Sequence, residues 1–175
     1  TLCYGDPAGN FTLSGNVGVI QYWESSVDGQ VTWKRMTNPA TSTLSPGNVT
    51  QDICFRTKVK SGVCDTAISS PACVTVSPTT KAGTLMNPST ICAGSNGGSL
   101  LLIGTVGTIQ YWELSTDGNT WTTFSNTEPT FTPIGLLTTT CYRVTVKSGV
   151  CPAATSNPIC VTVDQPTIPG SISGT

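Results

Sequence analysis

The chain has 175 residues, a formal net charge of −1 and only 10% charged residues. Such a nearly neutral chain offers no basic surface for nucleic acid or an anionic membrane. Eight cysteines and no histidine exclude histidine-based catalysis and favour disulfide bonds, and hence an oxidising extracellular compartment, over zinc sites. No apolar run is long enough to cross a bilayer, so we expect no direct membrane insertion, and we expect export and anchoring signals elsewhere in a longer secreted protein.

One stretch of the sequence occurs twice. Residues 54–76 read CFRTKVKSGVCDTAISSPACVTV, and residues 141–163, 87 positions further on, read CYRVTVKSGVCPAATSNPICVTV. The period and the alternating β-branched residues indicate copies of one small all-β module. We assign 1–78 to a first repeat that lacks its first strand, 79–164 to a complete repeat, and 165–175 to a linker and the first strand of a truncated next repeat.

Each module carries about seven short strand signals separated by turn signals such as Asp28-Gly29 and Asp117-Gly118. This pattern predicts an all-β fold, namely two tandem immunoglobulin-like β-sandwich domains with disulfides. The connectors are short and contain proline, which favours an extended arrangement. In the second module, the expected strands lie at 83–86, 99–106 and 109–113, near 121, at two places within 126–137, and in a closing hairpin over 141–163.

Trp23 and Trp112 are expected in the core, because an immunoglobulin sandwich packs a tryptophan of its third strand between the sheets. Neighbours on a strand face opposite sides, so Tyr22 and Tyr111 should point outward. There they could contact glycans by stacking on sugar rings, or simply cover a sheet edge.

In the closing hairpin the alternation predicts that Tyr142, Val144 and Val146 face the core, while Arg143, Thr145 and Lys147 face solvent. Arg56 and Arg143 occupy equal positions in the two copies. We interpret both as surface residues paired with a neighbouring carboxylate.

All eight cysteines are expected to form disulfides, four in each module. If the strands alternate in direction, the starts of the second and sixth strands lie at the same end on facing sheets. The two remaining cysteines of each module then share the loop at the opposite end. This reasoning predicts the pairs Cys3–Cys54, Cys64–Cys73, Cys92–Cys141 and Cys151–Cys160.

The sequence offers little catalytic chemistry, since it has no nucleophile elbow or phosphate-binding loop. Glu24 with Asp28, and Glu113 with Asp117, are the nearest carboxylate pairs, but a strand end followed by a turn aspartate explains them better. Ca²⁺ at the Asp-Gly loops is a minor alternative, because no DxDxDG loop is present. We therefore expect no enzyme, no catalytic or metal site and no cofactor.

The blocks IQYWE, Asp-Gly, C(F/Y)R, VKSGVC and CVTV together resemble the immunoglobulin-like repeats of giant secreted surface adhesins of gliding Bacteroidetes, the SprB-type mobile adhesins. This resemblance implies type IX secretion, a place at the cell surface, and movement by the gliding machinery while the filament grips a surface polysaccharide or substratum. It also implies possible O-glycosylation at Thr66, within Asp65-Thr66-Ala67, which the second copy lacks.

The favoured hypothesis is a repeat segment of a cell-surface adhesin filament, a disulfide-stabilised spacer and multivalent adhesive module whose partners are neighbouring repeats. The alternative is a carbohydrate-binding accessory module of a secreted polysaccharide-degrading enzyme. Residues 170–175 match the strand that the first module lacks. We therefore expect that this segment could add to the exposed sheet edge of a neighbouring molecule and give head-to-tail chains.

Overall fold

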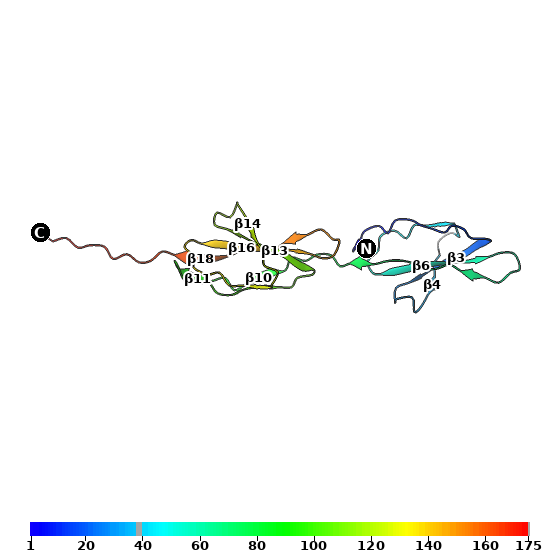
Figure 1. Cartoon of the computed structure of the whole chain (residues 1–175), viewed down its shortest axis with the longest axis horizontal. Coiled ribbons are helices and arrows are strands. Elements are labelled where there is room, and N and C mark those ends of the chain that lie inside the picture. The colour runs from blue at the N-terminus through cyan, green and yellow to red at the C-terminus, as the bar shows by residue number, and fades with distance from the viewer. Residues whose placement is uncertain (38–39, 175) are drawn as a thin grey trace. The chain divides into compact units, whose positions relative to one another are not determined.

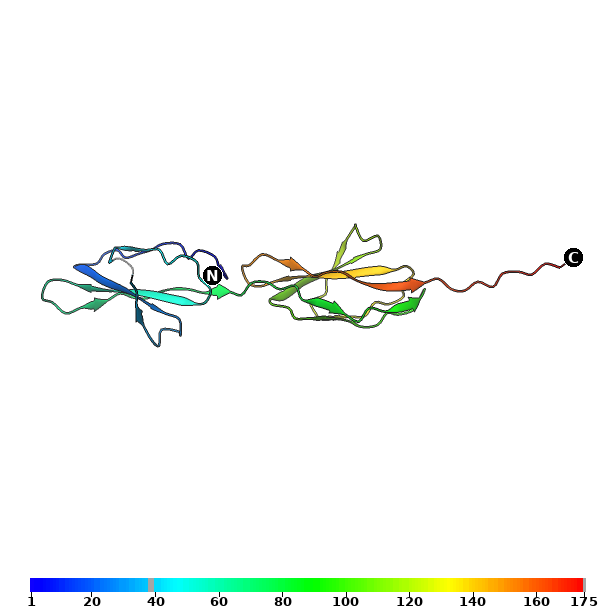
Figure 2. The same cartoon turned by 180° about the vertical axis from the view of Figure 1, so that it is seen from behind.

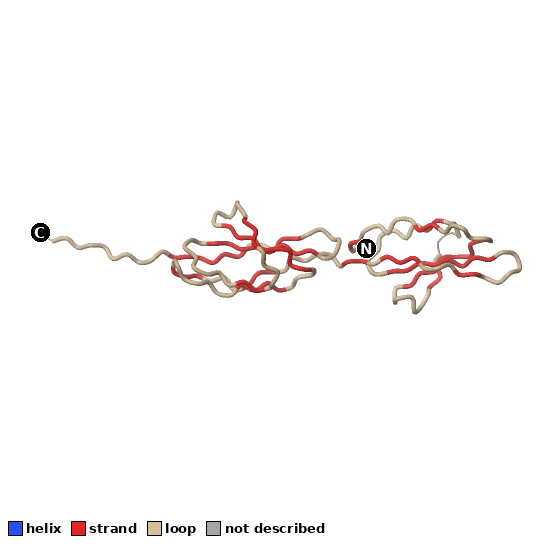
Figure 3. The backbone as a smooth tube through the Cα atoms, in the orientation of Figure 1, coloured by secondary structure: helices blue, strands red, loops and turns tan. Residues whose placement is uncertain are grey.

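The computed structural model describes residues 1–37 and 40–174, so the end of the predicted next strand, Thr175, lies outside the described residues. The described residues form strands and turns without a helix (Figure 3). None of them accordingly belongs to a helix that could cross a membrane. The chain folds as two units: unit 1 is Thr1–Thr79 with Gly149–Cys151, and unit 2 is Thr80–Ser148 with Pro152–Thr175.

Unit 2 is a sandwich of two sheets (Figure 1). One sheet has the order β10-β12-β15, and the other β11-β18-β16-β13-β14 with β17 beside β16. The strand β10 pairs antiparallel with β12, whereas β11 pairs parallel with β18 in the other sheet. The strands are β10 (Thr84–Met86), β11 (Thr90–Cys92), β12 (Leu100–Ile103), β13 (Thr108–Ser115), β14 (Thr122–Phe124), β15 (Thr130–Phe131), β16 (Thr140–Lys147), β17 (Ala154–Thr155) and β18 (Ile159–Asp164).

Unit 1 repeats this plan, and Figure 2 shows the same strands from behind. Its larger sheet has the order β4-β3-β6-β7 with β8 beside β6, its smaller sheet is β2-β5, and β1 pairs parallel with β9. No described strand of unit 1 corresponds to β10. The strands are β1 (Leu2–Cys3), β2 (Phe11–Thr12), β3 (Val19–Ser26), β4 (Lys34–Arg35), β5 (Thr43–Leu44), β6 (Ile53–Lys60), β7 (Ala67–Ile68), β8 (Ala72–Val74) and β9 (Val76–Ser77).

The cores are built as the alternation predicts. Trp112 is fully buried in unit 2 and Trp23 is 4% exposed in unit 1. Tyr142, Val144 and Val146 all point into the core of unit 2, because alternate residues of β16 face the other sheet. Both tryptophans also donate their indole N–H to a backbone carbonyl, that of Thr41 in unit 1 and that of Glu128 in unit 2.

Thr145 departs from the expectation, because it is buried and not solvent-facing. Its hydroxyl lies 2.9 Å from that of Thr155, and β17 pairs with β16 at this point. The first return strand of the hairpin thus lies beside β16 in the same sheet, and the two neighbouring hydroxyls hydrogen-bond to one another.

The return strand of each closing hairpin is divided in two. It begins at Ala67 or Ala154 and resumes as β8 or β18, which contain Val74 and Val161. Each is interrupted before a proline, where the hydroxyl of Ser69 or Ser156 accepts the backbone N–H of Thr57 or Val144. A serine hydroxyl thereby replaces a ladder partner where the strand is interrupted.

Candidate functional sites

Two disulfides fasten the closing hairpins. Cys54 bonds to Cys73 and Cys141 bonds to Cys160, with a sequence separation of 19 in each case. The two cysteines of each pair lie directly opposite one another in neighbouring antiparallel strands. Each bond therefore joins strands within one sheet and does not bridge the two facing sheets.

The third disulfide joins Cys3 to Cys151 and lies within unit 1. Both cysteines are buried, with exposures of 8% and 0%. The approach of this loop depends on Gly149, which has a φ of +49°; a Cβ atom there would lie 2.1 Å from the hydroxyl oxygen of Ser77. Glycine is needed for both reasons, since other residues rarely adopt this φ and would collide with Ser77.

Two structural features explain why the predicted pairs are wrong. The second part of each return strand, β8 or β18, carries Cys73 or Cys160 to the end where Cys54 and Cys141 lie. In addition, β11 belongs to the same sheet as β16, since β18 lies between them and pairs with both. It is not a strand of the facing sheet. The pairs that the structure does not contain are Cys3–Cys54, Cys64–Cys73, Cys92–Cys141 and Cys151–Cys160.

Two cysteines are left without a disulfide partner among the described residues. They are Cys64, in the loop after β6, and Cys92, at the end of β11. Both are exposed. The expectation that all eight cysteines are bonded is therefore wrong for these two positions.

The outer face of the large sheet carries the same stack in both units. In unit 1, Arg56 Nε donates to Glu24 Oε2 at 2.7 Å, and the guanidinium carbon lies 4.0 Å from the centre of the Trp33 ring. Unit 2 repeats the arrangement with Arg143, Glu113 and Trp121, at 2.7 Å and 4.1 Å. The neighbouring carboxylates expected for both arginines are thus these glutamates, whereas the tryptophan beneath each arginine was not predicted.

The outward tyrosines of the two units differ. Tyr22 is half-buried, with the guanidinium carbon of Arg35 at 4.4 Å and the ammonium of Lys58 at 5.5 Å from its ring centre. Tyr111 is 38% exposed, because Thr123 and Thr145 stand where unit 1 has Arg35 and Lys58. A sugar ring could therefore reach the face of Tyr111 but would have to displace cations at Tyr22.

The turn aspartates bind their own turns. The carboxylate of Asp28 accepts hydrogen bonds from Thr32 and Ser26, and these bonds, chiefly that from the Thr32 hydroxyl, hold its pKa well below the ordinary value of 3.8. Asp117 accepts the backbone N–H of Thr120, among others, with the same effect on its pKa. A carboxylate held by such bonds is an Asx-turn cap. The members of the pairs Glu24–Asp28 and Glu113–Asp117 thus each have a separate structural contact, the glutamates with arginine and the aspartates with their own turns.

The last predicted site residue is Thr66, the possible O-glycosylation site. Thr66 is exposed in the loop before β7, where a modifying group would be accessible. The described residues contain no cluster of three or more histidine, cysteine, aspartate or glutamate side chains that could hold a metal ion.

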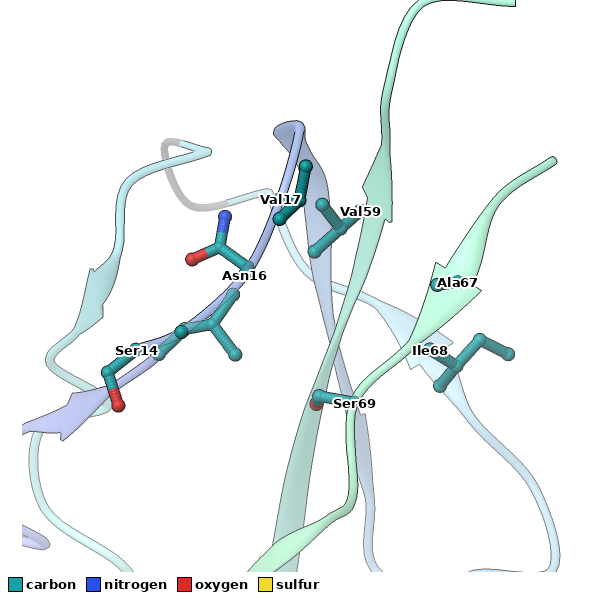
Figure 4. A pocket seen from close by; sticks show the side chains of 9 residues that line it. Ser14, Asn16, Val17, Val59, Ala67, Ile68 and Ser69 are labelled. Carbon is teal, nitrogen blue, oxygen red and sulfur yellow. The ribbon is translucent and has the colours of Figure 1, made fainter. Parts of the chain in front are cut away.

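Unit 1 has a groove of about 260 Å³ beside the end of β2, shown in Figure 4. Its walls come from Leu13 to Val17 on one side and from Val59 and Ala67–Ser69 on the other. The side chains of Val17 and Val59 lie close together at one end of it, and Ser69 lies at the other (Figure 4). The sequence predicted an exposed edge here but not a groove.

Comparison with known proteins identifies the fold. A solved structure, that of the amphioxus IgVJ-C2 molecule, matches with a TM-score of 0.53 and 10% sequence identity, over 93% of this chain and 99% of that one. The chain thus consists of two tandem immunoglobulin-like β-sandwiches with disulfide bonds, a combination typical of extracellular or secreted domains.

Comparison of the sequence with curated proteins gave no match. A family model, described as a domain of unknown function, DUF8696, matches at 1–78 and again at 81–165. The two matches together cover most of the sequence. The chain therefore belongs to the DUF8696 family and carries two copies of its domain.

Proposed function

We propose that the chain is a repeat segment of a cell-surface adhesin filament, which acts as a disulfide-stabilised spacer and makes multivalent, individually weak contacts. The observation that carries this proposal is the contrast between what the two copies share and what they do not. Both keep the buried tryptophan and the cross-strand disulfide, while the accessible tyrosine face differs between them. Repeats that share their framework and vary their surface suit a filament better than a single dedicated binding site.

The sequence resemblance to mobile adhesins of gliding bacteria supports the same proposal. On that basis the whole protein is exported by the type IX system, sits at the cell surface and is moved by the gliding machinery. Thr66 is the proposed O-glycosylation site, since it is exposed. The neighbouring repeats and a surface polysaccharide or substratum are the partners in this role.

Adhesion of coated beads tests this proposal. Beads that carry the chain at graded densities are pressed onto a polysaccharide-coated surface and pulled off under flow. Multivalent weak contact predicts adhesion that rises steeply with coating density, while a single soluble chain shows no measurable affinity. Adhesion that fails at every density would refute the adhesive part of the proposal.

A second candidate function rests on Tyr111 alone. Its exposed ring could be the platform of a carbohydrate-binding accessory module of a polysaccharide-degrading enzyme, because aromatic rings stack on sugars. A glycan array with the wild-type chain, Tyr111→Ala and the matched control Tyr22→Ala distinguishes the two candidates. A specific hit that Tyr111→Ala abolishes and Tyr22→Ala retains favours the module, and an array without hits favours the filament.

A further inference from the structure

Each of the two free cysteines is the counterpart of a disulfide-bonded cysteine in the other copy. Cys64 ends the sequence KSGVC, and Cys151 ends the identical KSGVC of the second copy. Cys92 stands at the end of β11, as Cys3 stands at the end of β1. Cys3 and Cys151 are bonded to one another. Cys92 and Cys64, which correspond to them, could form a disulfide of the same kind but have no partner among the described residues.

The surroundings of Cys92 reproduce those of Cys3. The strand pairings match, Leu2 with Val76 and Ile91 with Val163, both parallel. The turn that follows is also the same, since the N–H of Gly5 donates to the carbonyl of Val49 at 2.8 Å and that of Gly94 to the carbonyl of Leu136 at 2.7 Å. The surface that accepts Cys151 in unit 1 is therefore present again around Cys92, with Asp164 in place of Ser77.

The loop of Cys64 is likewise shaped like the loop of Cys151. Gly62 has a φ of +54°, close to the +49° of Gly149. A Cβ atom at Gly149 would collide with Ser77, whereas around Gly62 the space is open. Unit 1 thus presents a loop in the docking conformation, with nothing described against its glycine.

The groove of Figure 4 lies along the segment of unit 1 whose counterpart in unit 2 pairs with the first strand, β10. In unit 2, residues 81–86 run along 101–106, with Lys81 bridged to Val106 and Leu85 opposite Leu102. The groove of unit 1 is lined by the corresponding residues, from Leu13 to Val17. The segment 170–173, GSIS, matches 83–86, GTLM, and places the exposed Ile172 at the position of the buried Leu85.

We propose that a second copy of the chain docks here, with 170–173 of one molecule in the groove of the next and a disulfide between Cys92 of the first and Cys64 of the second. Each copy keeps one free thiol in each unit, Cys64 in unit 1 and Cys92 in unit 2, so the link propagates from copy to copy. The inference concerns how copies join, and it does not rest on the proposed adhesive role.

The bond forms by thiol–disulfide exchange with a small-molecule disulfide such as oxidised glutathione. The thiolate of Cys64 attacks the oxidant, forms a mixed disulfide and releases one glutathione thiol. The thiolate of Cys92 then attacks the Cys64 sulfur and releases the second. Two protein thiols are oxidised and one glutathione disulfide is reduced to two thiols, which balances the step.

The test is a non-reducing gel of the purified chain, at graded concentrations, in a buffer of oxidised and reduced glutathione. We expect a ladder of dimer, trimer and higher species that dithiothreitol collapses to monomer. Cys64→Ser and Cys92→Ser should each lose every band above the monomer when alone, and their mixture should give a dimer and nothing larger. Peptide mapping of that dimer should find Cys64 joined to Cys92.

Random oxidation of exposed thiols gives a different pattern. Either single variant would then still dimerise through its remaining cysteine, and this outcome, or a wild-type chain that stays monomeric, would overturn the proposal. Ile172→Asp should slow dimer formation while leaving both thiols in place; a wild-type rate would refute the docking of the segment in the groove. Neither cysteine is buried or bonded, so the serine variants keep the fold.

Discussion

Thr57 and Val144 occupy the same position of the central strands β6 and β16, and both are fully buried. The hydroxyl of Thr57 has no hydrogen-bond partner among the described residues. A buried polar group without a partner costs about 1–3 kcal/mol, because it loses its bond to water. Valine has nearly the same shape and is the residue that the second copy uses here. We therefore expect Thr57→Val to stabilise unit 1 by about 1–2 kcal/mol.

Hydrogen exchange with mass spectrometry can read the two units separately, through peptides from β6 and from β16. A gain of about 1–2 kcal/mol corresponds to about 5–30-fold slower exchange of the β6 amides that open by unfolding of the unit. The β16 peptide serves as the internal reference. The reverse change, Val144→Thr, should accelerate exchange in β16 and leave β6 unchanged. Unchanged or faster exchange of β6 in Thr57→Val would refute the reasoning from the unpaired hydroxyl.

Mapping of the unreduced monomer should find Cys3–Cys151, Cys54–Cys73 and Cys141–Cys160 and two titratable thiols; any other set contradicts the strand order. The double variant Cys141→Ser/Cys160→Ser should lower the free energy of unfolding of unit 2 by about 3 kcal/mol in urea denaturation, since the bond closes a loop of this length in the unfolded chain; a loss near zero would mean that the bond strains the native hairpin. The carboxylates of Asp28 and Asp117 have a lower pKa folded than unfolded, so the stability they contribute is present above pH about 4 and is lost as the pH falls below it. Thermal melts across this range should show that drop, and Asp28→Asn/Asp117→Asn should flatten it. Gly149→Ala should leave Cys3 and Cys151 as free thiols because of the clash with Ser77, whereas Gly62→Ala, in the loop of the unbonded Cys64, should leave the thiol count unchanged; a Gly149→Ala chain without additional thiols would contradict the clash.

The repeat and the core were predictable because their signals are local. Trp112, Tyr142 and Val144 alternate with polar neighbours, and the same alternation occurs in both copies, so the buried face could be read from the sequence. The stack of Arg143 on Trp121 also had a signal, since both residues recur in the first copy, as Arg56 and Trp33. What the sequence did not contain was the strand register that brings them together.

The disulfide pairing depended on non-local features. The parallel pairing of β11 with β18 joins residues about 70 positions apart and leaves no mark in the alternation of either segment. The end of β17 at Thr155 coincides with Ser156, whose hydroxyl replaces a ladder bond, and with Pro158 shortly after it. The sequence predicted that Tyr111 points outward but not how exposed its ring is. That exposure depends on Thr123 and Thr145, which lie in the two strands beside β13.

The bond between Cys141 and Cys160 limits how far the chain can lengthen under tension. In the variant Cys3→Ser/Cys151→Ser, which removes the covalent link across residues 4–150, a pull on the two ends of unit 2 would load the parallel pair β11 and β18 in shear, and after rupture the rest of the unit would unravel. The loop between the two cysteines, with a sequence separation of 19, would stay closed, which withholds about 60 Å of contour length per unit. A string of such units would yield in short steps, and reduction of the bond would lengthen every step by that amount.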